Sequence, residues 1–500
     1  MKRTLILILG ILITTTAVVA QEMKGTWHGA LQLNSLKLNL VLHVVNDSVC
    51  TLDSPDQGAK DIRGKVMELT AGKLNVQFPL LNASYDAELK DGKLTGSFKQ
   101  NGFTLPLTME RGELVRQRPQ TPQPPFPYET REVTFSHDSI TLAGTLTLPV
   151  PPQPSPKGKK AKSDAGVCLL MVTGSGLQDR DETLFDHKPF AVIADYLARH
   201  GIATLRYDDR GFGKSTGDPT QCTTADFAED AAAGVEFLRA LEERGENIEV
   251  RGTRCEVRGM GDEVRGTGGG KPMFSKVGIL GHSEGGSIAF MLGARQLPDF
   301  IVALAAPGIQ GDTLIVEQTN AMLSLEGQPA NMTRRTMHFM MAMQEQNPWY
   351  QYFVSYDPSA DIAATRCPVF ALNGSLDKQV LPESNLGEIE KLMGENIEVR
   401  GTRCEVRGTR GENRDTRCEV RGTRRENRDP RCEVRGTRRQ EARGEKQEAR
   451  SMTKLYPGLN HLFQHAMTGA VAEYGSIEET ISEEVLQDIV EWVDEVRGKR

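Results

Sequence analysis

One short motif constrains the fold of this chain more than any other feature of its sequence. Residues 281–285 read Gly-His-Ser-Glu-Gly, which matches G-x-S-x-G, and they follow the apolar run 277–280 and precede a stretch of small residues. This context predicts a strand, a tight turn that presents Ser283, and a helix. Glycines on both sides of the serine let neighbouring backbone approach closely. We therefore predict that Ser283 is a nucleophile at the end of a strand.

A serine hydroxyl is a weak nucleophile unless a base takes its proton, and a carboxylate must orient that base. In this setting the acid and then the base follow the serine along the chain. We predict Asp377 as the acid because it follows an apolar, strand-like run, with Glu383 as the alternative. We predict His461 as the base because it follows a turn after a short strand-like run. His465, four residues later, is expected at the surface or at the rim of the pocket.

Charge that develops on a substrate carbonyl oxygen needs preorganised N–H donors. One donor is expected to be the amide of Glu284, the residue after the nucleophile. The other is expected from the loop after the apolar run 167–172, with Ser175 as the predicted donor and Gly176 as the alternative.

The distance between acid and base looks too long until a repeat is removed. Residues 377 and 461 are 84 apart, whereas one helix, one short strand and their loops need roughly 25–35 residues. Residues 246–259 recur letter for letter as 395–408, and near-repeats of fourteen residues follow. Removing four such units brings the gap into the expected range. The tracts near 244–272 and 394–450 contain few apolar residues, so we predict solvated, disordered insertions, with a basic interaction arm as the alternative.

From residue 131 to the end, strand-like and helix-like segments alternate, which predicts an α/β domain with a doubly wound, mostly parallel sheet. A small helical cap is expected near 306–366. Its methionines and aromatic residues are predicted either to line an adaptable apolar pocket or to pack the cap's own helices: Met322, Met332, Met337, Met340, Met341, Met343, Trp349, Tyr350 and Tyr352.

The N-terminal part predicts three further units. Residues 1–20 combine a charged start, a short apolar run and small residues up to Ala20, as in a secretory signal peptide, with an uncleaved membrane anchor as the alternative. Residues 21–115 show short alternating segments and hairpin dipeptides, which predict a small all-β barrel or sandwich. Residues 116–130 are rich in proline and predict a semi-rigid linker. The expected location is therefore periplasmic or extracellular, with no stable membrane insertion after signal removal.

Charge and cysteine usage exclude some classes of partner. The formal net charge of -7 gives no reason to expect nucleic acid as a partner. Four of the eight cysteines lie in the repeats and no C-x-x-C pair occurs, so we expect no structural zinc site. Nucleophilic catalysis by Ser283, His461 and Asp377 needs no metal ion and no cofactor, so we expect neither. Cys168 and Cys367 lie in apolar runs and are expected to be buried, inert thiols.

Four segments together resemble a known family. They are Thr-Gly-Ser-Gly-Leu-Gln-Asp-Arg-Asp at 173–181, Tyr-Asp-Asp-Arg-Gly-Phe-Gly-Lys-Ser at 207–215, Gly-His-Ser-Glu-Gly-Gly at 281–286 and Gly-Leu-Asn-His at 458–461. From about residue 130 onward the chain resembles the α/β-hydrolase superfamily, in particular exported bacterial serine esterases that are grouped with serine aminopeptidases and dienelactone hydrolases. Residues 25–29 and 51–58 resemble a lipocalin-like domain that precedes some of these hydrolases. The resemblance implies structural roles for Asp209 and Arg210.

These residues predict acyl transfer from a small-molecule carboxylic ester, with a short-chain, aryl or sugar ester as the expected substrate. A serine peptidase or aminopeptidase with the same triad is the first alternative, and Asp179, Asp181 and Glu182 leave an amine-binding site open. A non-catalytic protein whose β-domain binds a ligand is the second alternative.

Overall fold

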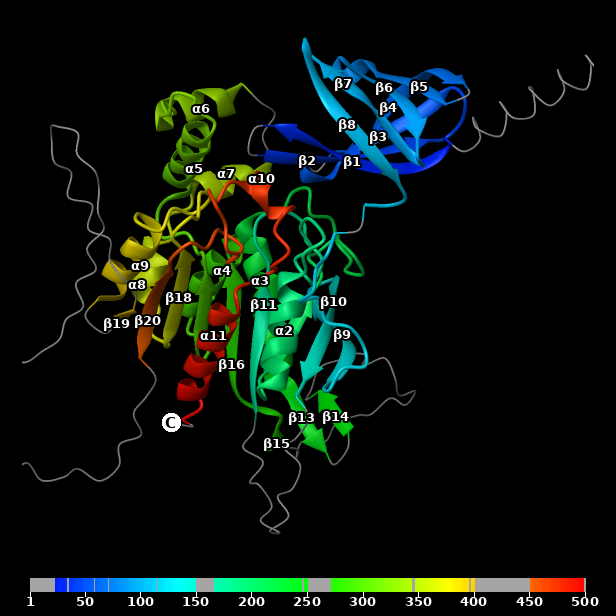
Figure 1. Cartoon of the computed structure of the whole chain (residues 1–500). Coiled ribbons are helices and arrows are strands. Elements are labelled where there is room, and N and C mark those ends of the chain that lie inside the picture. Colours follow the sequence, from blue (N-terminus) through cyan, green and yellow to red (C-terminus); the bar gives the residue numbers. More distant parts are fainter. Residues whose placement is uncertain are drawn as a thin grey trace, which may run out of the picture.

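The computed structural model describes residues 23–33, 36–57, 59–70, 72–114, 116–149, 166–244, 247–250, 271–343, 347–394, 397–400 and 450–498. The predicted signal peptide and Cys255, Cys404, Cys418 and Cys432 lie outside these ranges. Two bodies make up the described chain, a closed barrel and a larger sheet covered by helices (Figure 1). None of the helices in the described ranges has the length and apolarity that a bilayer-spanning segment needs.

The first body is an eight-stranded barrel in which each strand pairs antiparallel with the next and β8 closes onto β1. Both residues of the Asp91-Gly92 and Asn101-Gly102 turns have positive φ, as type I′ hairpins require, and this explains why these dipeptides predicted hairpins. The strands are β1 (Gly25–Leu33), β2 (Leu36–Val44), β3 (Val49–Ser54), β4 (Ala59–Thr70), β5 (Lys73–Phe78), β6 (Ala83–Lys90), β7 (Lys93–Gln100) and β8 (Phe103–Arg111), with the short 3-10 helices η1 (Pro55–Gln57) and η2 (Pro79–Leu81) between them.

The interior of the barrel is filled by its own side chains. Trp27, Phe78 and Tyr85 are almost fully buried among the aliphatic residues that alternate along the strands. The Trp27 indole N–H donates to the carbonyl of Met23, and the Tyr85 hydroxyl donates to the carbonyl of Leu94, so these polar atoms have partners inside. A ligand in the centre of this barrel would have to displace the aromatic core.

Removing Trp27 should therefore destabilise the barrel. We expect Trp27→Ala to lower the free energy of unfolding by about 3–5 kcal/mol, because the cavity adds to the lost burial. Urea unfolding of the full chain, followed by tryptophan-independent far-UV circular dichroism, measures this change. Phe103→Ala is the matched control, since Phe103 is exposed at the barrel rim, and its effect should stay within about 0.5 kcal/mol.

The second body is built on a nine-stranded sheet in the order β19-β20-β18-β17-β16-β11-β12-β10-β9. At one edge β10 pairs antiparallel with both of its neighbours, β9 and β12, and all other neighbouring strands are parallel. This is the α/β-hydrolase fold, as predicted. The strands are β9 (Glu129–His137), β10 (Ile140–Leu148), β11 (Gly166–Val172), β12 (Ala203–Tyr207), β16 (Phe274–His282), β17 (Ile301–Leu304), β18 (Val369–Gly374), β19 (Ile397–Arg400) and β20 (Ser451–Tyr456).

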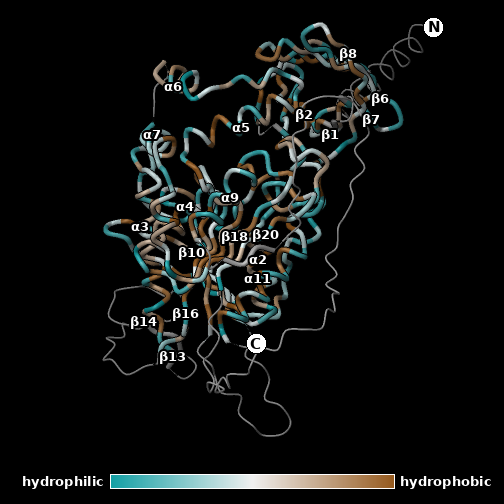
Figure 2. The backbone as a smooth tube through the Cα atoms, turned by 90° about the vertical axis from the view of Figure 1, so that its left-hand side faces the viewer, coloured by the Kyte–Doolittle hydropathy of each residue, from teal (hydrophilic) through white to brown (hydrophobic). Residues whose placement is uncertain are grey.

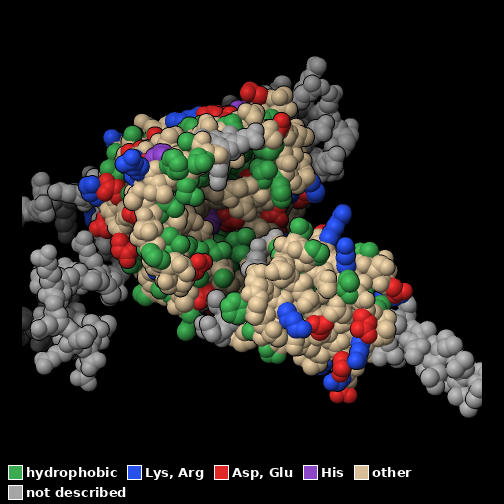
Figure 3. Space-filling view, turned by 90° about the horizontal axis from the view of Figure 1, so that it is seen from above, with side chains coloured by type: hydrophobic (Ala, Val, Ile, Leu, Met, Phe, Trp, Pro, Cys, Tyr) green, Lys and Arg blue, Asp and Glu red, His purple; other side chains and the backbone are tan. Residues whose placement is uncertain are grey.

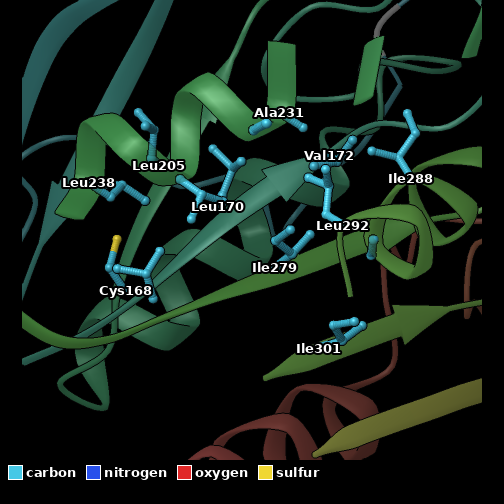
Figure 4. Close-up of a cluster of buried hydrophobic side chains, with 14 of the residues drawn as sticks. Cys168, Leu170, Val172, Leu205, Ala231, Leu238, Ile279, Ile288, Leu292 and Ile301 are labelled. Atoms are coloured by element: carbon cyan, nitrogen blue, oxygen red, sulfur yellow. The ribbon is translucent and has the colours of Figure 1, made fainter. Parts of the chain in front are cut away.

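Helices cover both faces of this sheet. Along β11, Cys168, Leu170 and Val172 point into one hydrophobic core and the alternate residues into another, as a central parallel strand requires (Figure 4). The apolar strands form the centre of the second body (Figure 2). The first core is closed by α3 (Thr224–Ala240), α4 (Glu284–Ala294), α8 (Ser359–Ala364) and α9 (Asn385–Met393), and the second by α2 (Pro189–Arg199) and α11 (Glu483–Val496).

The two repeat tracts differ from the prediction at their beginnings. Ile-Glu-Val is part of a strand in both copies: β14 (Asn247–Val250) pairs antiparallel with β13 (Leu241–Arg244), and β19 (Ile397–Arg400) adds a parallel edge strand beside β20. The prediction of disorder was therefore wrong for these residues, because adjacent strand edges supply backbone partners that the composition does not reveal. β15 (Lys271–Pro272) completes the small sheet with β13, and the remaining repeat residues lie outside the described ranges.

The predicted linker lies against the second body. Arg116 pairs with Asp56 of the barrel, with side chains only 7% and 3% exposed, and also with Asp186 of the second body. The Arg118 guanidinium donates to three backbone carbonyls of two loops, those of Phe185, Gly475 and Ile477. The segment therefore forms specific contacts with both bodies instead of acting only as a spacer.

Candidate active site

The turn that carries Ser283 has little room for any other sequence. Ser283 has φ +54° between β16 and α4, a conformation that side chains rarely adopt. A Cβ on Gly281 would lie 2.0 Å from the carbonyl oxygen of Gly285, and one on Gly285 would lie 2.1 Å from that of Val172. The glycines at these positions are therefore required by close backbone contacts, and the strained serine is of the kind found at functional sites.

The structure brings the predicted acid and base together. His461 Nδ1 lies 2.8 Å from Asp377 Oδ2, and both side chains are buried. The other carboxylate oxygen of Asp377 accepts the amide N–H groups of Gln379 and Val380, each at 2.8 Å. Within the described part of the chain, no hydrogen bond joins the Ser283 hydroxyl to the His461 ring. The His461 backbone carbonyl nevertheless contacts His282, the neighbour of Ser283.

The two alternative residues lie elsewhere. Glu383 is exposed, and the His465 side chain is 68% exposed and bonded to Glu479. Neither forms a hydrogen bond or ion pair with Asp377 or His461 in the described part of the chain.

The predicted oxyanion residues lie beside the nucleophile. A Cβ on Gly174 would be 3.2 Å from Ser283 Cβ, so the loop that follows β11 packs directly on the serine. Glu284 is the first residue of α4, and the first amides of a helix have no intrahelical acceptor. The Ser175 side chain lies near enough to the Glu284 carboxyl to favour its charged form.

The carboxyl group of Glu284 also connects the nucleophile turn to the cap. It accepts hydrogen bonds from the Thr224 hydroxyl at 2.6 Å and from the Trp349 indole N–H at 2.8 Å. Burial raises the pKa of Glu284 above its ordinary value, although these donors favour the charged form. The sequence did not reveal this role; its one signal was a carboxylate directly after the nucleophile.

The cap consists of α5 (Gly311–Leu325), α6 (Arg334–Ala342) and α7 (Pro348–Ser355), followed by α8. Met332, Met337, Met341 and Tyr350 pack in a small core inside it, which agrees with the packing alternative for these four. Met340 and Met343 are exposed. Seen from above, the molecule is hollowed between its two bodies, with histidine and acidic side chains visible at depth (Figure 3).

The turn after β12 is held by ion pairs. Arg180 forms a two-point contact with Asp208, and Arg210 forms one with Asp230. Asp209 accepts hydrogen bonds from the Gln178 amide and the Thr173 hydroxyl, both in the loop that follows β11. These contacts support structural roles for Asp209 and Arg210.

Asp209 should make stability depend on pH. Burial of its carboxyl raises the pKa of Asp209 to about 8. The folded state therefore holds a proton that the unfolded state loses near pH 4, so this group's contribution to stability falls as pH rises from about 4 to 8. Asp209→Asn replaces the ionisable carboxyl with an amide that does not titrate. The stability of this variant relative to the natural chain should therefore rise with pH, by at most roughly 1.4 kcal/mol per pH unit. Urea unfolding at pH 5 and pH 8 measures this difference; the exposed Asp218→Asn should show no such trend.

The acidic residues considered for an amine site are already engaged. Asp179 caps the turn at Thr183, and Asp181 pairs with Arg206 and Lys188. Glu182 pairs with His282.

No cluster of three or more His, Cys, Asp or Glu side chains that could hold a metal ion occurs in the described ranges. Cys50, Cys168, Cys222 and Cys367 are free thiols. Burial raises the pKa of Cys50 to about 11 and that of Cys367 to about 12, which disfavours the reactive thiolate.

The sheet order and the strained serine after β16 are those of the α/β-hydrolase fold. By sequence, the chain is similar to Esterase EstD of Thermotoga maritima, with 25% identity over 245 residues that cover 46% of this chain and 52% of the relative. The chain thus spans about half the length of this curated relative. No protein-family model matches.

Solved structures give matches of low score. Esterase Pf2001 of Pyrococcus furiosus is 15% identical, with a TM-score of 0.35 over 74% of this chain and 92% of that one. A proline iminopeptidase of Mycobacterium smegmatis is 12% identical, with a TM-score of 0.39 over 73% of this chain and 98% of that one.

Proposed function

We propose that this chain is a serine hydrolase that cleaves carboxylic esters through an acyl-enzyme. One observation carries the proposal: a buried Asp377–His461 pair, joined at 2.8 Å, lies beside the strained turn that presents Ser283. The name of the relative from Thermotoga maritima supports an ester as substrate. The predicted signal peptide supports export to the periplasm or the extracellular space.

In the proposed reaction, Ser283 Oγ attacks the ester carbonyl carbon while His461 Nε2 takes the hydroxyl proton. Asp377 accepts the Nδ1–H of His461 and stabilises the imidazolium that forms. The amides of Glu284 and Ser175 would bind the oxyanion. The intermediate collapses, and the leaving alkoxide takes the proton from His461. Water then attacks the acyl carbon with His461 again as base, which releases the acid and restores the Ser283 hydroxyl.

A peptidase with the same triad is the second candidate. An aminopeptidase needs an unpaired carboxylate to bind the substrate ammonium group, whereas Asp181 already pairs with Arg206 and Glu182 with His282. This favours a neutral ester of a short acyl chain, an aryl group or a sugar. Nucleic acid is not an expected partner.

The test has two readouts. A fluorophosphonate probe should label the protein once, and peptide mass spectrometry should locate the label on Ser283. Hydrolysis of p-nitrophenyl esters of increasing acyl length is then compared with that of aminoacyl p-nitroanilides, with the probe-blocked protein as control. Turnover of esters that fades with chain length supports the proposal. Turnover of anilides alone would favour the peptidase over the esterase. Absence of a label on Ser283 would overturn both candidate functions.

A further inference from the structure

A buried histidine that the proposed mechanism does not use touches three parts of the site. His282 is the last residue of β16, and its side chain is 8% exposed. Its Nδ1 lies 2.9 Å from Glu182 Oε1, and its Nε2 lies 3.1 Å from the backbone carbonyl oxygen of His461. The same Glu182 oxygen accepts the amide N–H of Gly174 at 2.8 Å.

The partners of His282 determine its protonation. A backbone carbonyl can only accept, and Glu182 Oε1 already accepts from Gly174, so both ring nitrogens face acceptors. The ring satisfies both only when each nitrogen carries a hydrogen, that is, as the imidazolium. Burial by itself lowers the pKa of His282, but Glu182, the His461 carbonyl and the charge of Asp377 outweigh it, and the net pKa lies above the ordinary value.

The contacts of this ring connect the loop after β11 with the loop that carries His461. Through Glu182 it holds Gly174, whose loop packs on Ser283 and carries the predicted donor Ser175. Through the backbone carbonyl of His461 it holds the loop that carries the base. The ring centroids of His282 and His461 are 4.8 Å apart. Hydrogen bonds from a charged donor are stronger than those from a neutral one, so the cation holds both loops more firmly.

Stability does not explain such a pair. A buried ion pair of this kind can often be replaced by apolar side chains without loss of stability, because desolvation offsets the attraction. A requirement for fixed geometry between two loops does explain it.

We propose that the His282 imidazolium, paired with Glu182, is a positioning residue that fixes the base loop and the oxyanion loop relative to Ser283. This inference rests on the proposed function. The charged and titratable groups that face His282 are Glu182 from the loop after β11 and the Asp377–His461 pair from the loops after β18 and β20. When His282 loses its second proton at high pH, one of the two contacts is lost, so kcat acquires an alkaline limb.

The test compares three variants by their pH profiles. His282→Gln is neutral at every pH and offers a single donor group in place of two ring nitrogens that point apart. We expect kcat to fall by about 10- to 100-fold, with KM changed less than about threefold and the alkaline limb absent. Glu182→Gln keeps an acceptor but removes the charge, so kcat near pH 6 should stay close to the natural value and the limb should move to lower pH. His465→Gln, at an exposed histidine, is the matched control and should leave the profile unchanged.

A second measurement does not depend on turnover. With 15N-labelled histidine, the NMR shifts of the His282 ring should show both nitrogens protonated at neutral pH, and the assignment follows from the signal lost in His282→Gln. A neutral ring at pH 7 would overturn the inference, as would an alkaline limb that is the same in Glu182→Gln and the natural chain. Because the NMR result stands even if no ester is cleaved, failure of this inference is distinguishable from failure of the proposed function. Asp209→Asn should keep the limb, which separates the titration of His282 from that of Asp209, whose pKa is raised to about 8.

Discussion

Alanine in place of Ser283 is expected to lower kcat for a p-nitrophenyl ester by about a million-fold, to the residual rate that binding and the oxyanion donors sustain. The change removes the only oxygen that can form the acyl-enzyme, whereas the positive φ of this residue and the glycines around it are unaffected. The free energy of unfolding should therefore change by less than about 1 kcal/mol. Initial rates with purified protein, together with urea unfolding, measure both quantities.

Ser287→Ala provides the matched control for this variant. Ser287 lies one turn along α4 and is as buried as the residues around it, so it tests the removal of a hydroxyl from the same helix without touching the nucleophile. It should retain activity within a few-fold. Activity in Ser283→Ala above about 1% of the natural rate would contradict the assignment of Ser283 as nucleophile.

The architecture of the second body followed from patterns that are local in the sequence. The run at β11 is apolar at every position because both faces of a central parallel strand are buried, and helices recur between such runs. The barrel was predictable for a similar reason, since Asp-Gly and Asn-Gly pairs determine their own backbone conformation. The strands at the start of the two repeat tracts were not predictable.

Those strands show how context decides structure. Ile-Glu-Val occurs in both repeat tracts, yet residues 248–250 pair antiparallel with β13 and residues 397–399 pair parallel with β20. Strand preference depends on the neighbouring edge more than on the segment itself. Composition described the repeat tracts correctly as poor in apolar residues, but it carried no information about which strand edge lay beside their first residues.

Within the site, the residues that could be named in advance were those defined by type and order. Ser283 is marked by its glycines, and Asp377 and His461 by their positions after strand-like runs. Glu182 and His282 are 100 residues apart, and Glu284 meets Trp349 across 65 residues. Such pairs depend on how loops pack in three dimensions, so a single sequence gives no period or spacing from which to infer them.

Asp377→Asn is expected to lower kcat by about ten-thousand-fold, because it reverses the tautomer of His461. One oxygen of Asp377 accepts the amides of Gln379 and Val380, so in the variant the side-chain carbonyl must take that position. The NH2 group then faces His461 Nδ1 and donates to it. The ring proton moves to Nε2, and the nitrogen nearest the nucleophile can no longer accept the proton of Ser283. Steady-state kinetics with the same ester measures the loss.

The size of this effect distinguishes an orienting acid from a nearby charge. Glu383→Gln also removes one carboxylate close in sequence, but Glu383 is exposed and forms no hydrogen bond or ion pair with His461 in the described part of the chain. The kcat of this variant should therefore remain within about twofold of the natural value. A loss of only tenfold in Asp377→Asn would mean that Asp377 acts through its charge alone and that another group orients the base. A loss near ten-thousand-fold, with unchanged stability, is the result expected when the acid fixes which nitrogen of His461 carries the proton.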